Sequence, residues 1–176
     1  MIGVIRRLDR EKTKQFSEDF CLIDKESFGN EAWAQQNFER TLPGKFVLSR
    51  VALHKGRPIG YLIASRYHLG FGHIHRLTVR STFKRKGIGS RLLKSFERDC
   101  VKNGMAEITL ESLKGRDEAN RFYERNGFVT ISRERLENYL KAKGKIADAE
   151  RYSGFSPSGQ SLVYIKSLKP KAHTYG

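Results

Sequence analysis

The sequence predicts an α+β fold of mixed α/β character, with helices flanking one central sheet. Segments rich in Val, Ile, Leu and Tyr alternate with segments in which large apolar residues recur at helical spacing. There are no internal repeats, and only Lys141–Gln160 has the composition of a linker. With 176 residues, the chain is long enough for one domain with its own core and short for two.

The first elements follow directly from these patterns. Residues 1–8 form a short, apolar segment, which predicts a strand. A helix is expected from Asp9 onward, because Phe16, Phe20 and Ile23 are spaced to share one helical face.

A second helix and three strands are expected in the middle of the chain. Residues 30–42 predict the helix, with Trp33, Phe38 and Leu42 as its large apolar residues. The β-rich stretches 45–55 and 58–68 are separated by the turn residues Gly56-Arg57-Pro58, which predicts a hairpin. Residues 73–79 form the next expected strand.

The last part of the chain alternates between the two kinds of element. A helix is expected from Ile88 to Gly104, where the glycine suits a C-terminal cap. A strand at 106–112 is followed by a helix that Asp117 can cap. Residues 128–132 and 161–168 complete the sheet, which therefore has about seven strands.

Composition narrows the class of protein. Charged residues make up 30% and apolar residues 38%, and no apolar run approaches the roughly 20 residues that span a bilayer. The N-terminus lacks the apolar stretch of a signal peptide. Cys21 and Cys100 are far apart and lack metal-ligand spacing, and His73 and His75 have no further ligands at zinc spacing. We therefore expect a cytoplasmic protein with reduced thiols, without a metal and away from membranes.

The chain is strongly basic. Lys and Arg number 34 against 19 Asp and Glu, which gives a net charge of +15. Between Arg76 and Arg98 there are eight cations and one acid, Glu97. Such a field attracts polyanions, whether nucleic acid, membrane headgroups or a phosphorylated cofactor.

The stretch 84–93, KRKGIGSRLL, lies in the middle of this cluster. Gly87 and Gly89 precede a helix, where the backbone can approach a ligand and the first N–H groups lack helical partners. These features predict a phosphate site. A P-loop is excluded because the lysines precede the glycines, and a dinucleotide fingerprint because Leu92 stands where a third glycine is needed.

Two segments resemble motifs of the GNAT superfamily of acyl-CoA N-acyltransferases. Val79-Arg80 followed by 84–89 is similar to motif A, Arg/Gln-x-x-Gly-x-Gly/Ala, with a lysine at the Arg/Gln position. Residues 119–128, ANRFYERNGF, are similar to motif B, Leu/Phe-Tyr-x-x-x-Gly-Phe. Leu110-Glu111 resembles the Leu-Glu of bacterial ribosomal-protein N-alpha-acetyltransferases. The resemblance covers about residues 1–170, with specific motifs only between Val79 and Phe128.

The resemblance implies a fold and an acyl donor. The sheet should be mostly antiparallel and splayed between strands four and five, and acetyl-CoA should bind there through its pyrophosphate. The chain departs from the family at Arg116, which replaces an asparagine that contacts the cofactor, and Asn120 is a nearby substitute. The implied cofactor-binding residues are Leu77, Thr78, Val79, Lys84, Arg85, Lys86, Gly87, Ile88, Gly89, Ser90, Asn120 and Tyr123.

The same resemblance suggests catalytic residues for transfer of acetyl to a primary amine. The amine must lose a proton before attack, and the leaving thiolate gains from a proton donor. Tyr123 is the candidate acid and Glu111 the first candidate base. His73 is a second candidate, because an unperturbed imidazole titrates near neutral pH and other GNAT branches place a base on strand four. A water chain remains a third alternative.

The acceptor is less defined. A protein N-terminus or lysine is favoured by the likeness around Glu111 and Tyr123, whereas the net charge of +15 disfavours small cationic amines. Nucleic acid is an alternative acceptor, and a non-enzymatic RNA-binding module is an alternative function. We expect one domain over residues 1–176, as a monomer or homodimer, with a substrate-side insert around 133–160 and a short basic tail at 169–176. The resemblance implies that residues 27–33 and this insert determine the choice of acceptor.

Overall fold

The computed structural model describes residues 3–67, 71–142 and 160–168 of the chain. Its centre is a seven-stranded sheet in the order β1-β2-β3-β4-β5-β7-β6, in which β4 and β5 pair parallel and all other neighbours pair antiparallel. This confirms the predicted mixed sheet. The strands are β1 (Val4–Arg7), β2 (Arg50–His54), β3 (Arg57–Tyr67), β4 (Phe71–Val79), β5 (Glu107–Leu113), β6 (Val129–Ile131) and β7 (Ser161–Ser167).

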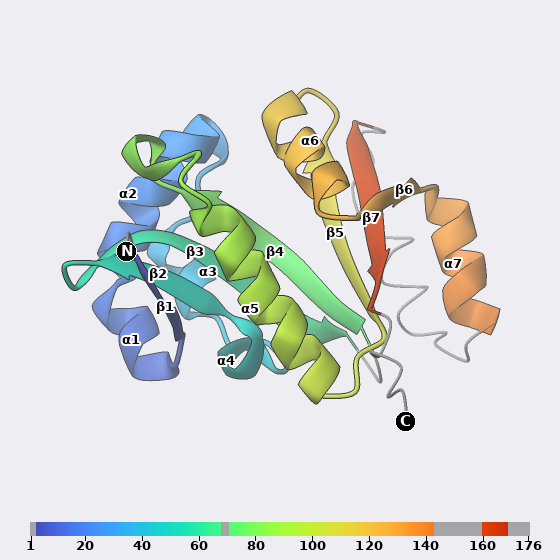
Figure 1. The fold of residues 1–176 in the computed structure, drawn as a ribbon, viewed down its shortest axis with the longest axis horizontal. Coiled ribbons are helices and arrows are strands. Elements are labelled where there is room, and N and C mark those ends of the chain that lie inside the picture. Colours follow the sequence, from blue (N-terminus) through green and yellow to red (C-terminus); the bar gives the residue numbers. More distant parts are fainter. Residues whose placement is uncertain (1–2, 68–70, 143–159, 169–176) are drawn as a thin grey trace, which may run out of the picture.

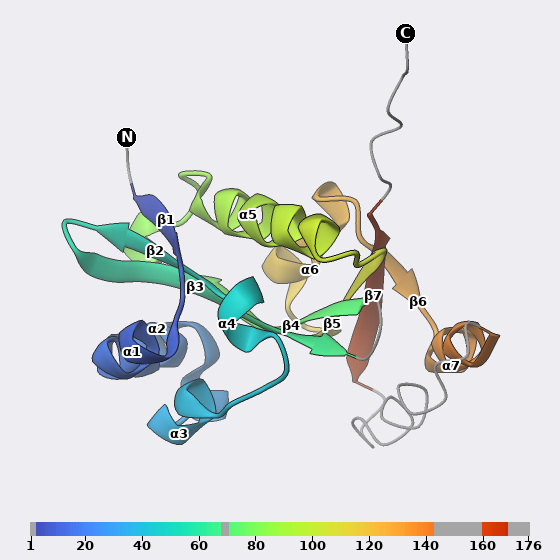
Figure 2. The same ribbon diagram turned by 90° about the horizontal axis from the view of Figure 1, so that it is seen from below.

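Helices cover both faces of the sheet (Figures 1 and 2). Those that precede β2 lie mainly on one face, and α5 and α6 lie on the other. The α7 helix lies beyond β6, at the end of the sheet opposite β1. The helices are α1 (Arg10–Gln15), α2 (Ser17–Phe28), η1 (Gly29–Glu31), α3 (Gln35–Glu39), α4 (Lys45–Leu48), η2 (Ser81–Phe83), α5 (Ile88–Lys102), α6 (Asp117–Arg125) and α7 (Arg133–Ala142).

Each face has its own apolar core. On one face, Leu92, Leu93 and Phe96 of α5 are fully buried in the largest cluster, against residues of β3, β4 and β5. On the other, Phe20 of α2 and Phe38 of α3 pack against Tyr61 with ring centroids 5.0 and 5.3 Å from the Tyr61 ring. The two cores hold the middle of the sheet rigidly between helices.

Three local predictions were wrong. Residues 30–42 do not form one helix, because the backbone is extended at Ala32 and Ala34 and the chain turns there between η1 and α3. Residues 45–48 form α4 rather than the start of a strand, and Lys45 is buried with its ammonium group donating to the Phe38 and Arg40 carbonyls.

The third concerns the cap of α6. Arg116 is the N-cap residue and makes no side-chain cap hydrogen bond, whereas Asp117 is already the first residue of the helix. Its carboxylate still lies in the first turn, where it is favoured by the helix dipole.

Some expectations fall outside the described residues. Of the predicted insert, α7 is described, whereas 143–159 is not, and neither is the predicted tail at 169–176. Within the described ranges, no cluster of three His, Cys, Asp or Glu side chains could hold a metal ion. No described helix combines the length and apolar character that a membrane crossing requires. Cys21 and Cys100 are both free thiols.

Candidate active site

The sheet opens between β4 and β5. The two strands pair only from Phe71↔Glu107 to Ile74↔Leu110, and beyond these pairs they diverge (Figure 1). A cavity of about 890 Å³ fills the fork and is lined by residues of β4, β5, α2, α5 and α6. Among the residues that the structure describes, no strand pairs with this edge of β4 beyond Ile74.

A β-bulge in β4 coincides with the start of the fork. The register with β3 shifts so that Ile63 faces Arg76 while Ala64 faces Ile74, which leaves His75 as the extra residue. Because the bulge changes the alternation, Ile74 and Leu77 both pack with the α5 core, and Arg76 faces α2. The bulge therefore directs an arginine into the α2 side of the fork.

The loop before α5 presents unpaired backbone N–H groups. Arg85 and Gly87 both have left-handed backbone conformations, with φ of 57° and 75°. Ile88, Gly89 and Ser90 form the first turn of α5, where N–H groups have no helical acceptor. Such a sequence of N–H groups at a helix N-terminus is an anion site. A residue with a side chain at position 85 in this conformation is uncommon and is consistent with a functional loop.

Most of the predicted cofactor-binding residues line the cavity. The amide-bearing loop and the edge of β4 that faces the fork both contribute to its lining. The predicted residues found there are Leu77, Thr78, Val79, Lys84, Arg85, Gly87, Ile88, Gly89, Ser90 and Tyr123.

Glu111 stands on β5 just past the last paired residues, and it lines the cavity. Its Oε2 atom pairs with Arg133 Nη2 of α7 at 3.3 Å. Its Oε1 atom is buried and accepts no hydrogen bond from any residue that the structure describes. Burial raises the pKa of the Glu111 carboxyl, and Arg133 opposes part of that shift. A carboxylate with a raised pKa and a free oxygen is suited to accept a proton.

Replacing Arg133 by glutamine should move the acid limb of the kcat/KM profile to higher pH. Arg133 stabilises the ionised form of Glu111, so its removal leaves burial unopposed and raises the Glu111 pKa further. We expect a shift of up to about one pH unit. The profile of Arg135→Gln, an exposed arginine of the same helix, serves as control. An unchanged acid limb would mean that Glu111 does not set it.

Tyr123 of α6 lies on the cavity wall with 7% of its surface exposed. Its ring packs against Phe128 and Tyr164, with centroids 5.7 and 6.0 Å away. Its hydroxyl makes no hydrogen bond with the described residues, so it is available to a ligand. Burial raises the pKa of the Tyr123 phenol, and the charge of Arg116 lowers it in part. The group is therefore protonated at neutral pH and able to donate.

The forked sheet, the amide loop before α5 and the Tyr123 phenol agree with the sequence resemblance. The comparison with protein families decides to which family the chain belongs. The Acetyltransferase (GNAT) domain family matches residues 9–143, which is most of the chain. The chain belongs to the GNAT acetyltransferase family. It is therefore an N-acyltransferase by family. This assignment disfavours the alternative function of a non-enzymatic RNA-binding module.

Solved structures share the GNAT fold over nearly the full chain. Ard1 from Thermoplasma volcanium is 22% identical, with a TM-score of 0.73, and the match covers 97% of this chain and 100% of that one. The ribosomal-protein-S18-alanine N-acetyltransferase from Escherichia coli is 14% identical, with a TM-score of 0.69 and 99% of each chain covered.

A third solved structure contains the cofactor. The PaiA N-acetyltransferase from Thermoplasma acidophilum, in complex with coenzyme A, is 16% identical with a TM-score of 0.67, covering 95% of this chain and 99% of that one. At these identities the likeness shows the fold. No curated protein sequence matches the chain.

Two predicted residues of the GNAT site lie elsewhere. His73 is in the closed part of the sheet, where its Nδ1 atom lies 2.9 Å from the Thr109 hydroxyl and its ring stacks on Tyr67 at 4.5 Å. It does not line the cavity. Asn120 is also outside the lining, and its amide donates to the Leu113 carbonyl at 3.0 Å, which fixes the loop between β5 and α6. Neither residue reaches the fork.

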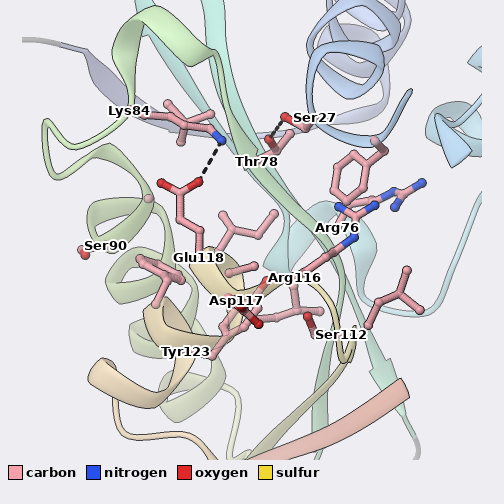
Figure 3. Close-up of a pocket in the computed structure, with 18 of the residues that line it drawn as sticks. Ser27, Arg76, Thr78, Lys84, Ser90, Ser112, Arg116, Asp117, Glu118 and Tyr123 are labelled. Carbon is pink, nitrogen blue, oxygen red and sulfur yellow. Dashed lines mark hydrogen bonds and ion pairs between the residues drawn. The ribbon is translucent and has the colours of Figure 1, made fainter. Parts of the chain in front are cut away.

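Two cations near the amide loop also point away from the cavity. Lys86 is absent from the lining, and its ammonium group donates to the Thr82 carbonyl at 3.0 Å. Arg91 donates to the Gly3 carbonyl at 2.9 Å. The cationic groups that remain at the loop are Lys84 and Arg85, of which Lys84 pairs with Glu118 across the mouth of the fork at 3.4 Å (Figure 3).

Phe28, the last residue of α2, and Glu31 of η1 line the cavity, and both belong to the segment 27–33 that the resemblance links to substrate choice. The sequence alone did not assign three other residues to the cavity. Arg76 and Arg116 were noticed only as part of a basic cluster and as a family departure. His75 lines the fork because of the bulge, and no sequence pattern marks a bulge without a glycine.

Proposed function

We propose that the protein transfers an acetyl group from acetyl-CoA to the primary amine of a protein N-terminus or lysine, by direct attack in a ternary complex. The observation that carries this proposal is the forked cavity. One wall offers the backbone N–H groups at the start of α5, and the other offers the Tyr123 hydroxyl and the Glu111 Oε1 atom, which has no hydrogen-bond partner among the described residues. Donor and acceptor can therefore meet between β4 and β5.

Acetyl-CoA fits the residues present. Its pyrophosphate suits the N–H groups of the loop before α5, and Lys84 and Arg85 add positive charge there. The amide groups of its pantetheine arm suit the unpaired edge of β4, as an added strand would. Bound there, acetyl-CoA supplies the thioester.

The residues of the chain then handle the protons. The acceptor amine forms the new N–C bond as the C–S bond breaks. Glu111 takes the proton that the amine loses, directly or through one water molecule, and Tyr123 donates to the leaving thiolate. The backbone N–H groups of the diverging β4 edge are available to stabilise negative charge on the carbonyl oxygen. Each role needs only groups that line the cavity.

Replacing Lys84 and Arg85 together by alanine should raise KM for acetyl-CoA about tenfold, because two charges near the phosphates are lost. The turnover number should change little, since neither side chain reaches the reacting atoms. Lys86→Ala removes one charge outside the cavity and is the control for each single variant, Lys84→Ala and Arg85→Ala, which also remove one charge. Steady-state kinetics with varied acetyl-CoA measure both. An equal rise in KM for the control and the single variants would indicate only long-range charge.

Nucleic acid is the second candidate acceptor, for example an aminoacylated RNA. The net charge of +15 favours it. An acceptor of this kind would give a steep fall in kcat/KM with salt, because phosphate contacts release counterions. A peptide acceptor with few charges would show a much weaker dependence.

The test uses acetyl-CoA labelled on its acetyl group. The purified protein is incubated with it and with a desalted cell extract supplemented with free amines, and the label is then followed into protein, nucleic acid and small molecules. Label in the protein fraction, and its loss in Tyr123→Phe, is the expected result. Label in nucleic acid would establish the second candidate, and no transfer from a folded protein would overturn both.

A further inference from the structure

Two arginines lie against one phenylalanine ring on the α2 side of the fork. The Arg76 guanidinium carbon is 3.8 Å from the centroid of the Phe28 ring, and the Arg116 guanidinium carbon is 4.3 Å from it. Arg76 comes from β4 and Arg116 from the loop that follows β5, so the two arginines belong to the two arms of the fork (Figure 3). All three residues line the cavity. Cation–π contacts of this kind hold guanidinium groups in place without using their donors.

The charges of the two arginines are balanced in different ways. Arg76 lies 3.5 Å from the Asp24 carboxylate, which is fully buried and also accepts hydrogen bonds from Tyr61 and Trp33. Arg76 is therefore neutralised inside the protein. Arg116 has a carboxylate partner only in Glu31, at 3.1 Å, among the residues that the structure describes.

Glu31 is a weak partner for Arg116. Its side chain is 61% exposed, and it belongs to the three-residue helix η1 rather than to a packed element. Exposed pairs of this kind contribute little, so a competing carboxylate can displace it at small cost. Arg116 forms one hydrogen bond to a described side chain and has further donors for a bidentate contact.

Arg116 is also near the reacting groups. Its charge lowers the pKa of the Tyr123 phenol. Arg116 is the N-cap residue of α6 and Tyr123 lies within this helix, and both residues line the cavity. An acceptor whose amine lies at Glu111 and Tyr123 would therefore place its neighbouring atoms near Arg116.

We infer that the acceptor carries a carboxylate beside its reactive amine, as a peptide with Asp or Glu among its first two residues does, and that Arg116 binds this carboxylate in place of Glu31. The inference rests on the proposed function and specifies its substrate class. The charge count favours a carboxylate over a phosphate dianion: with Asp24 neutralising Arg76, displacement of Glu31 leaves one positive charge. Glu31 itself shows that a carboxylate fits against Arg116.

The test compares peptides that differ only in Glu, Gln or Lys at the first or second position, with acetyl-CoA in excess and release of free thiol as the readout. The wild-type protein should prefer a Glu peptide to its Gln counterpart by about tenfold in kcat/KM, as a charged hydrogen bond predicts. Arg116→Gln should reduce this ratio to near one, whereas Glu31→Gln should raise it. Arg76 is left intact because its removal would strand the buried Asp24 charge.

Two controls separate recognition from folding and general charge. Arg121→Gln removes the same charge from an exposed position of α6 and should leave the Glu/Gln ratio unchanged. Arg116→Lys keeps the charge without the planar fork and should retain part of the preference. Coenzyme A binding, measured by calorimetry, verifies that each variant is folded.

The possible failures are distinct. Acetylation of all peptides with a ratio near one, or an equal loss for Glu and Gln peptides in Arg116→Gln, would overturn this inference and leave the proposed function standing. Acetylation of an aminoacylated RNA oligonucleotide but of no peptide would overturn the inference and establish the second acceptor class. Transfer to no acceptor at all would overturn the proposed function as well.

Discussion

Replacing Tyr123 by phenylalanine should lower kcat about a hundredfold, which is within the usual contribution of a positioned acid. The substitution removes one oxygen from a hydroxyl that has no partner among the described residues, so packing against Phe128 and Tyr164 is kept. Affinity for acetyl-CoA should therefore change little, because the ring remains on the cavity wall. Single-turnover rates and a coenzyme A titration measure the two quantities separately.

Tyr164→Phe provides the control for this effect. Tyr164 is fully buried beside Tyr123, and its hydroxyl donates to Glu124 at 3.0 Å, outside the cavity. Loss of that hydroxyl should affect stability more than kcat. If Tyr123→Phe kept the wild-type kcat, the leaving thiolate would be protonated by another group or by water, and Tyr123 would be a wall residue only.

The sequence predicted the parts of the fold whose signals are local. The period-2 and helical patterns located β4, α5 and β5. Gly87, which has a left-handed backbone conformation, lies where the loop that follows β4 ends and α5 begins. The helix predicted at 30–42 was wrong, because a short segment with several large apolar residues does not by itself specify a helix. The buried Asp24 carboxylate accepts the Trp33 N–H instead, and that contact is tertiary.

The residues of the site also divide into those that local sequence signals predict and those that depend on tertiary structure. Residues adjacent to the amide loop were predictable, because one loop conformation sets them all. His73 was misplaced because the sequence does not show where two parallel strands stop pairing, and the fork begins only after Ile74. Arg76, Phe28 and Arg116 come together from three distant segments, so no spacing rule could join them.

Replacing Glu111 by glutamine should lower kcat/KM about a hundredfold at neutral pH, if the carboxylate accepts the amine proton. The amide is nearly isosteric, but it cannot take a proton and it loses the charge that pairs with Arg133. The residual rate should rise with pH, since only acceptors that are already neutral would react. The acid limb that Glu111 sets in the wild-type profile should disappear.

Glu107→Gln tests whether charge alone explains such a loss. Glu107 lies four residues earlier on β5, so its side chain points to the same face, but it pairs with Tyr139 outside the cavity. Equal effects of both substitutions would assign the loss to the general field of the strand. A full rate in Glu111→Gln would leave proton removal to water. The raised pKa of Glu111 would then reflect only burial of a carboxylate that Arg133 holds against the sheet.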